Sequence, residues 1–199
     1  MAICLDGDAD RVLVIDEQGC PIDGDHFLGM IASRWQKDNI LVEKTLVATV
    51  MSNMHLETFL NREGIKLVRT AVGDRYVVEQ MRLNGFNLGG EKSGHVVMTD
   101  YSTTGDGLMA GLQFLAEMVR RGEPASAVGR PFELAPQKTE NIIYASEKNP
   151  LDNPSVKKMI SESEKKISGL GRLIVRKSGT ERLITVSYTH LTLPTINWV

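Results

Sequence analysis

Cysteine is scarce in this sequence of 199 residues, which carries only Cys4 and Cys20. Their spacing suits neither a disulfide framework nor paired metal ligands, so we expect a reducing, cytoplasmic setting without a signal peptide. Long apolar runs are lacking too. The longest are broken by charges or glycine and fall short of the about 20 residues that span a bilayer. We therefore expect no membrane span.

Positive charge is not in excess. The sequence has 23 Lys and Arg residues and 25 Asp and Glu residues, so the formal net charge is −2. That balance provides no global field to hold a nucleic-acid backbone or an anionic membrane, so neither is expected as a partner. Any anion must be bound locally. The remaining composition, 42% hydrophobic and 24% charged, is ordinary for one or two small globular domains.

Between residues 23 and 122 helical apolar spacing, as from Phe27 to Trp35, alternates with strand-like runs such as 45–50. Alternation of this kind favours a sheet with parallel strands flanked by helices. Residues 121–136 turn to Gly, Pro, Ala and Ser and resemble an inter-domain linker. A strand near 141–145, a helix beginning at Asn153-Pro154 and two further strands then predict a smaller unit. The expected fold class is α/β, a βαβ-type mixed-sheet domain followed by a smaller α+β domain.

The segment Asp6-Gly7-Asp8-Ala9-Asp10-Arg11 places carboxylates at every second position, where an extended or looped backbone turns them to one side. Three close carboxylates repel one another unless a cation neutralises them, and hard oxygen ligands favour Mg²⁺ or Ca²⁺. Nothing downstream supplies the other ligands of an EF-hand, so Mg²⁺ is preferred. Arg11 adds a planar fork suited to phosphate. The alternative is a solvated acidic turn.

The glycine-rich segment from Gly89 to His95 follows a strand-like run, at the edge where α/β sheets present ligand sites. Glu91 and Ser93, two residues apart, could bind neighbouring sugar hydroxyls, and His95 has a pKa suited to moving a proton. The alternative is a glycine-rich hairpin with a structural histidine. Arg75, in a turn before a helix, is a weaker candidate that could simply pair with a carboxylate.

A third polar segment, from Arg176 to Glu181, combines two cations, two hydroxyls and a glycine between strands, as a phosphate dianion requires. It does not match the Walker pattern, which disfavours an NTPase. The alternative is a polar hairpin tip. The candidate phosphate ligands are Arg176, Ser178, Gly179 and Thr180.

Taken in order, the motifs DGDADR, VGDRYV, GEKSGH and RKSGTE resemble the α-D-phosphohexomutase family from residue 1 to about Val186. Members have four domains around one cleft. The resemblance implies that residues 1–20 end the second domain with the metal loop, 21–132 form the sugar-binding third domain and 133–186 form an incomplete phosphate-binding fourth domain. Residues 187–199 resemble nothing in the family and are expected to be an unrelated tail.

The sequence around these motifs is most similar to that of family members that interconvert glucosamine 6-phosphate and glucosamine 1-phosphate. This reaction is a step toward UDP-N-acetylglucosamine and the cell wall. In that reaction a phosphoserine phosphorylates the sugar, giving a sugar 1,6-bisphosphate that turns over and returns its other phosphate. The implied Mg²⁺ ligands are Asp6, Asp8 and Asp10. Arg11 would contact the transferring phosphate and His95 would carry a proton, while the implied substrate-binding residues are Arg75, Glu91, Ser93, Arg176, Ser178, Gly179 and Thr180.

The chain departs from the family in several places. The phosphoserine segment has no counterpart here, so we expect the fragment alone to be inactive, with a homodimer as one arrangement of the full-length protein. Related members carry a lysine near Ala71, whose charge Arg75 could replace, and Arg182 stands where a proline is usual. Two other functions stay open: a Mg²⁺-dependent sugar-phosphate phosphatase using one of the three aspartates as nucleophile, and a non-catalytic sugar-phosphate binding module.

Overall fold

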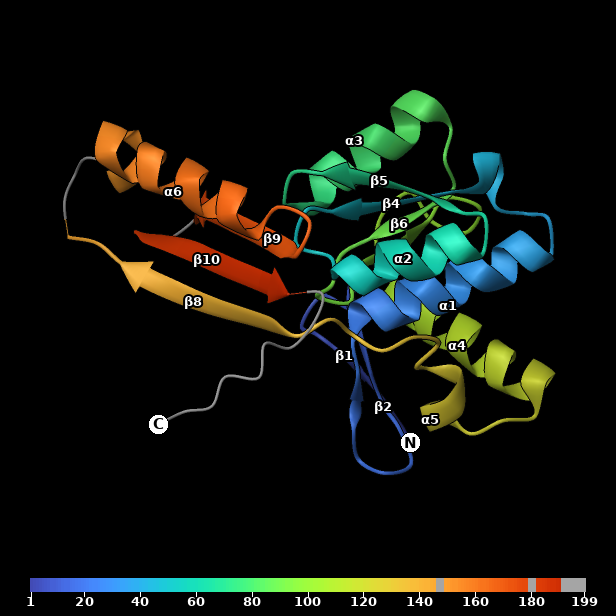
Figure 1. Cartoon of the computed structure of the whole chain (residues 1–199). Coiled ribbons are helices and arrows are strands. Elements are labelled where there is room, and N and C mark those ends of the chain that lie inside the picture. Colours follow the sequence, from blue (N-terminus) through green and yellow to red (C-terminus); the bar gives the residue numbers. More distant parts are fainter. Residues whose placement is uncertain (146–148, 179–181, 191–199) are drawn as a thin grey trace. The chain divides into compact units, whose positions relative to one another are not determined.

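The computed structural model describes residues 1–145, 149–178 and 182–190. The chain divides into two compact units, Met1–Glu133 and Leu134–Val199. Each unit has its own sheet and its own helices (Figure 1). The expected class, an α/β mixed-sheet domain followed by a smaller α+β domain, is confirmed.

Unit 1 is built on a four-stranded sheet of order β5-β4-β6-β7. Strands β4, β5 and β6 run parallel, and β7 returns antiparallel to β6. The parallel strands therefore end at one common edge, where the loops that follow them meet. The strands are β4 (Thr45–Thr49), β5 (Lys66–Thr70), β6 (Leu88–Gly90) and β7 (Val96–Met98).

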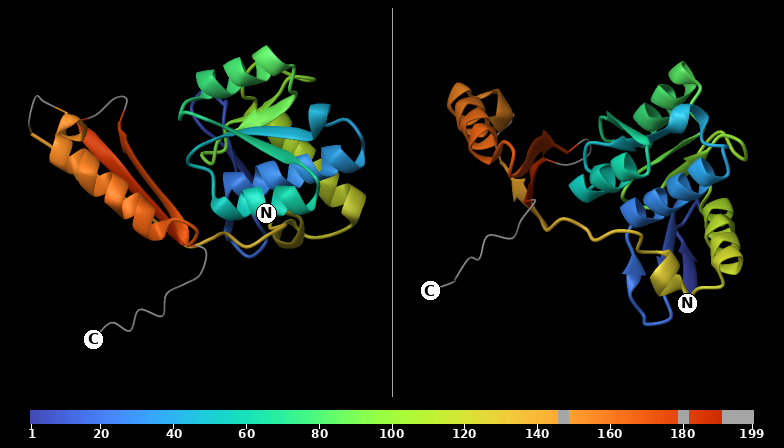
Figure 2. Two further views of the ribbon diagram at one scale, coloured as in Figure 1. Left: turned by 45° about the horizontal axis from the view of Figure 1, so that its top comes forward. Right: turned by 45° about the vertical axis from the view of Figure 1, so that its right-hand side comes forward.

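Helices cover both faces of this sheet (Figures 1 and 2). Alternate residues of the central strand point to opposite faces, so Leu46 joins the cluster packed with α1 and α2, while Val47 joins α3 through Val77 and Met81. Full burial of each such side chain stabilises the fold by about 1.5–3 kcal/mol. The helices are α1 (Gly24–Lys37), α2 (Met54–Arg62) and α3 (Asp74–Asn84), with the short η1 (Val42–Lys44) before β4.

A second sheet of order β1-β2-β3 belongs to the same unit, and α4 (Gly107–Arg121) packs on it. Asp106 caps α4 by accepting a hydrogen bond from the Met109 N–H at 2.8 Å, and Gly122 ends the helix in the left-handed region. Phe114 of α4 stacks on Phe27 of α1 and joins this sheet to the main core. The strands are β1 (Ala2–Leu5), β2 (Val12–Ile15) and β3 (Pro21–Ile22).

The segment that leaves unit 1 follows the short helix α5 (Ala125–Val128) and is held at several points. Arg130 pairs with buried Asp16 at 2.6 Å. The His26 ring, through Nε2, lies 2.8 Å from the Phe132 carbonyl oxygen, and Nδ1 of His55 lies 2.8 Å from that of Glu133. The part of the expected linker from Arg130 to Glu133, called the exit segment below, is thus packed onto unit 1.

Unit 2 is a three-stranded antiparallel sheet of order β8-β10-β9, with α6 packed against β9. As the Asn-Pro pair predicts, Asn153 caps α6 and Pro154 is its first residue. β10 extends through His190, so four residues of the expected tail, 187–190, are paired strand. The elements are β8 (Gln137–Ile143), η2 (Pro150–Asp152), α6 (Pro154–Ile167), β9 (Gly171–Lys177) and β10 (Leu183–His190).

Among the described residues, none of the helices has both the length and the apolar character required to cross a membrane.

Candidate functional site

The acidic loop connects β1 and β2. Its turn is closed by the Ala9 N–H, which donates to the Asp6 carbonyl at 3.2 Å, and Ala9 itself takes a positive φ of 59°. Asp6, Asp8 and Asp10 each offer a carboxylate oxygen within 4.8 Å of the others. Burial raises the pKa of Asp10, and the carboxylates of Asp8 and Asp6 raise it further against the opposing effect of His95. The three carboxylates thus converge as the alternating pattern predicts.

Arg11 closes the acidic loop on itself. Its Nε lies 3.9 Å from Asp6 Oδ2 and 3.8 Å from Asp10 Oδ1, and its backbone N–H donates to Asp6 Oδ1 at 3.2 Å. The side chain is 49% exposed. Water weakens such exposed ion pairs, so the guanidinium can exchange a carboxylate for a phosphate at small cost.

The glycine-rich segment docks on the acidic loop through backbone contacts. The Val12 N–H donates to the Gly94 carbonyl at 3.1 Å, and Arg11 and His95 form a short antiparallel bridge. Gly94 has a φ of 92°, and a Cβ there would lie 2.2 Å from the Val12 carbonyl oxygen. Only glycine allows this approach, which brings two segments more than 80 residues apart in the sequence together.

His95 is buried beneath this contact. Its Nε2 lies 3.4 Å from Asp10 Oδ2 and its side chain is 2% exposed. Gly105 leaves the space for the ring, since a Cβ there would lie 2.3 Å from Nε2. Sequence reasoning missed this supporting role of Gly105, for which the sequence carries no local signal.

Glu91 and Ser93 lie at the carboxyl end of β6. Glu91 Oε1 accepts a hydrogen bond from the Gly73 N–H at 3.0 Å, so the turn before α3 holds this carboxylate. Ser93 lines a hollow of about 270 Å³ together with Asp6 and Arg11. The structure therefore places Ser93 next to the acidic loop. Gly73, also missed, belongs to the VGDRYV motif that pointed to Arg75 instead.

The other predicted residues are Arg75 in unit 1 and the segment from Arg176 to Thr180. Arg75 is exposed and lies over the ring of Tyr76, with its guanidinium carbon 4.5 Å from the ring centre. Arg176 and Ser178 belong to unit 2, where the Ser178 N–H donates to the Leu183 carbonyl at 2.9 Å and Arg176 Nε is buried without a hydrogen-bond partner. Gly179 and Thr180 lie outside the described residues.

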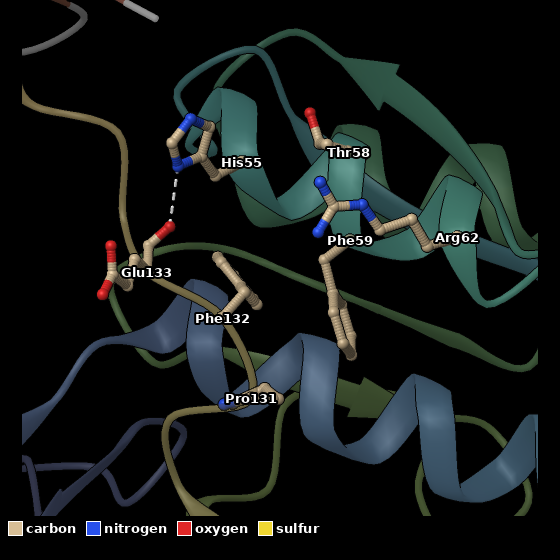
Figure 3. A pocket seen from close by; sticks show the side chains of 7 residues that line it. All are labelled: His55, Thr58, Phe59, Arg62, Pro131, Phe132 and Glu133. Carbon is tan, nitrogen blue, oxygen red and sulfur yellow. Dashed lines mark hydrogen bonds between the residues drawn. The ribbon is translucent and has the colours of Figure 1, made fainter. Parts of the chain in front are cut away.

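A larger hollow, of about 350 Å³, lies elsewhere on unit 1, between α2 and the exit segment (Figure 3). Phe59 and Phe132 stack in its wall with ring centres 5.1 Å apart. Exposed Arg62 and Glu133 supply opposite charges at its rim. None of the residues predicted from the sequence lines it.

Together, these features define unit 1 as a three-layer α/β domain, with the Glu91–His95 loop at the carboxyl edge of its sheet and the acidic loop docked on it. Residues 23–132 match the family model described as phosphoglucomutase/phosphomannomutase, alpha/beta/alpha domain III. The chain belongs to the phosphoglucomutase/phosphomannomutase family.

Curated relatives extend the likeness beyond this domain. A phosphoglucosamine mutase of Ruegeria sp. (strain TM1040) is 60% identical over 186 residues, which cover 94% of this chain and 42% of the relative. One of Roseobacter denitrificans is 57% identical over 190 residues, again 42% of its length. The chain thus spans less than half the length of these relatives.

Solved structures share the fold at low identity. An N-acetylphosphoglucosamine mutase of Aspergillus fumigatus, in complex with GlcNAc-6P and magnesium, is 20% identical with a TM-score of 0.75 over 96% of this chain and 45% of that one. An N-acetylglucosamine-phosphate mutase in a substrate complex is also 20% identical, with a TM-score of 0.74 and the same coverage.

Proposed function

We propose that this chain is the sugar- and phosphate-binding part of a phosphoglucosamine mutase, which in its full length interconverts glucosamine 6-phosphate and glucosamine 1-phosphate. The observation that carries the proposal is the convergence of three carboxylates, Arg11 and the Glu91–His95 loop at one edge of the sheet. The 60% identity to a phosphoglucosamine mutase supports the choice of sugar. The exposed free cysteines are compatible with a reducing cytoplasm.

Asp6, Asp8 and Asp10 fit a Mg²⁺ ion, because they offer oxygens only, within 4.8 Å of one another, and leave positions free for phosphate. A bound Mg²⁺ would neutralise charge on the transferring phosphoryl group. Arg11, which already lies beside two of these carboxylates, would hold the phosphate from the other side.

Glu91 and Ser93 are proposed to bind sugar hydroxyls, because Gly73 uses one Glu91 oxygen and leaves the other available. His95 is the expected proton carrier, but its burial against Asp10 favours an orienting role for its imidazole. The Arg176 segment is proposed to bind the phosphate that does not react, with Arg75 as an outer contact. The phosphoserine would come from another part of the full-length protein, and a sugar 1,6-bisphosphate would be the intermediate.

A chimera tests this proposal directly. Residues 1–186 replace the matching segment of the Ruegeria enzyme, and conversion of glucosamine 6-phosphate to glucosamine 1-phosphate is measured with and without Mg²⁺. We expect Mg²⁺-dependent turnover in the chimera and none in the chain alone. A folded chimera that turns over no hexosamine phosphate would contradict the proposal.

The same assay separates the two alternatives. Release of inorganic phosphate from glucosamine 6-phosphate by the chain alone would support a phosphatase, since the three aspartates all lie on this chain. Binding of the sugar phosphate without turnover, in both the chain and the chimera, would support a binding module.

A further inference from the structure

The first residue of α1 packs directly against the backbone of the loop that carries Glu91 and Ser93. A Cβ added to Gly24 would lie 2.3 Å from the Lys92 carbonyl oxygen and 2.9 Å from that of Glu91. Real side chains essentially never approach backbone atoms so closely, so any larger residue at position 24 must displace the loop. Gly24 is helical and not at positive φ, so its backbone conformation does not itself require glycine. The requirement comes from the loop.

Asp23 holds the same loop through its charge. As the N-cap of α1, its side chain accepts a hydrogen bond from the Asp25 N–H at 2.9 Å. Its Oδ2 also lies 3.6 Å from Lys92 Nζ. The carboxylate therefore fixes the first turn of the helix and attracts the loop residue between Glu91 and Ser93.

Asp25 ties this helix start to a second loop of the sheet edge. The side chain is fully buried, and its Oδ2 accepts a hydrogen bond from the Asn53 N–H at 2.7 Å. Asn53 is the N-cap of α2, in the turn that follows β4. Burial raises the pKa of Asp25, although the Asn53 N–H opposes this effect. A buried carboxyl costs stability unless hydrogen bonds compensate for the lost water, and here the Asn53 N–H supplies such a bond.

We propose that Asp23, Gly24 and Asp25 form a positioning clamp for the Glu91–Ser93 loop, setting the distance of the Glu91 carboxylate from the sheet edge. The clamp supports the loop backbone from the α1 side, while the Gly73 N–H fixes the Glu91 carboxylate from the α3 side. These three are positioning residues, since they act through the loop. The inference rests on the proposed function, in which this loop binds the sugar.

Gly24→Ala is the first test, with Gly29→Ala as the matched control. Both glycines lie in α1, but a Cβ at Gly29 would meet the Phe132, Leu56 and Phe59 side chains instead of the loop. In the chimera we expect Gly24→Ala to raise KM for glucosamine 6-phosphate about tenfold and to leave the Kd of Mg²⁺ within about twofold, as one lost oriented contact predicts. Equal KM values for the two variants would overturn the clamp.

A milder variant keeps the proposal testable if Gly24→Ala does not fold. Asp23→Asn retains the cap, since Asn caps as well as Asp, but removes the charge that faces Lys92. We expect a KM increase of about threefold, and no further increase when Lys92→Met is added, because the pair acts as a unit. An unchanged KM in Asp23→Asn, or fully additive effects, would count against the clamp.

Hydrogen exchange of residues 89–95 in the chain itself separates this inference from the proposed function. Gly24→Ala should speed exchange in that segment about tenfold, a factor that Gly29→Ala should not produce. If the unmodified chimera lacks activity while the exchange result holds, the function fails and the clamp stands. If the chimera is active and the exchange is unchanged, the clamp fails and the function stands.

Discussion

Units 1 and 2 differ in how they hold their polar segments. Unit 1 has a buried apolar cluster on each face of its four-stranded sheet, and the larger cluster includes Leu28, Trp35 and Phe114. In the part of unit 2 that the structure describes, the buried apolar residues are Ala135 and Ile184, and α6 has none. The acidic loop and the Glu91 loop thus rest on a packed core, whereas the Arg176 segment rests on a sheet with little interior.

This difference shows where site geometry comes from. In unit 1, Gly94 packs against the Val12 carbonyl and Gly105 packs against the His95 ring, each so closely that neither position has room for a Cβ. Close-packed interiors transmit any displacement to their neighbours, so such loops are pre-organised before a ligand binds. In the described part of unit 2 a comparable approach is found at Gly171, against the Thr189 carbonyl, at the opposite end of β9 from Arg176. The contribution of the Arg176 segment should therefore consist mainly of charge.

The largest expected effect separates the two cores directly. Trp35→Ala should destabilise unit 1 by about 3–5 kcal/mol, the usual cost of truncating a fully buried aromatic side chain. Met159→Ala in α6 is the matched change in unit 2 and should cost less than about 0.5 kcal/mol, since this side chain is 68% exposed. Hydrogen exchange read by mass spectrometry gives each unit its own value. Equal losses would remove the contrast.

The second effect tests the acidic loop of unit 1 in the active chimera. Asp8→Asn should lower kcat about a thousandfold and remove most of the response to Mg²⁺, because metal-based charge stabilisation contributes several kcal/mol. Calorimetric titration with Mg²⁺ gives a readout that does not depend on turnover. The control is Asp152→Asn, an acidic residue in unit 2 outside the proposed site. Full activity in Asp8→Asn would exclude the metal assignment.

Sequence reasoning reached further in some places than in others, for physical reasons. The alternation of Asp6, Asp8 and Asp10 is local, so the convergence of their carboxylates could be predicted. The strand expected at 141–145 is found at 137–143, because pairing with β10 sets its ends and local propensity does not. The Glu91–Gly73 bond and the burial of His95 under Gly105 depend on tertiary contacts that no local pattern encodes.

The third effect belongs to unit 2. Arg176→Gln in the chimera should raise KM for glucosamine 6-phosphate about tenfold with kcat changed less than about threefold, because a remote phosphate contact contributes mainly uniform binding. Arg172→Gln on the same strand is the control. A kcat loss as large as that of Asp8→Asn would mean that unit 2 takes part in positioning as closely as unit 1. An unchanged KM would count against the Arg176 assignment.

The smallest effect concerns the point where unit 1 ends. His26 Nε2 must donate to the Phe132 carbonyl, while Nδ1 is buried without a partner, and burial lowers the pKa of His26 below its usual value near 6.5. The unfolded chain therefore gains a proton before the folded chain does, and unit 1 loses stability as the pH falls below about 6.5. Protonation of Nδ1 in the folded chain would leave a buried N–H donor without a partner, which costs about 1–3 kcal/mol. Between pH 7.5 and 5.5 we therefore expect the free energy of unfolding of unit 1 to fall by about 1 kcal/mol.

His26→Gln can still donate to the Phe132 carbonyl but cannot titrate. Hydrogen exchange of α1 should therefore show a smaller loss of stability in this variant over the same pH interval. If both proteins lose equal stability, groups other than His26 govern the acid response of unit 1.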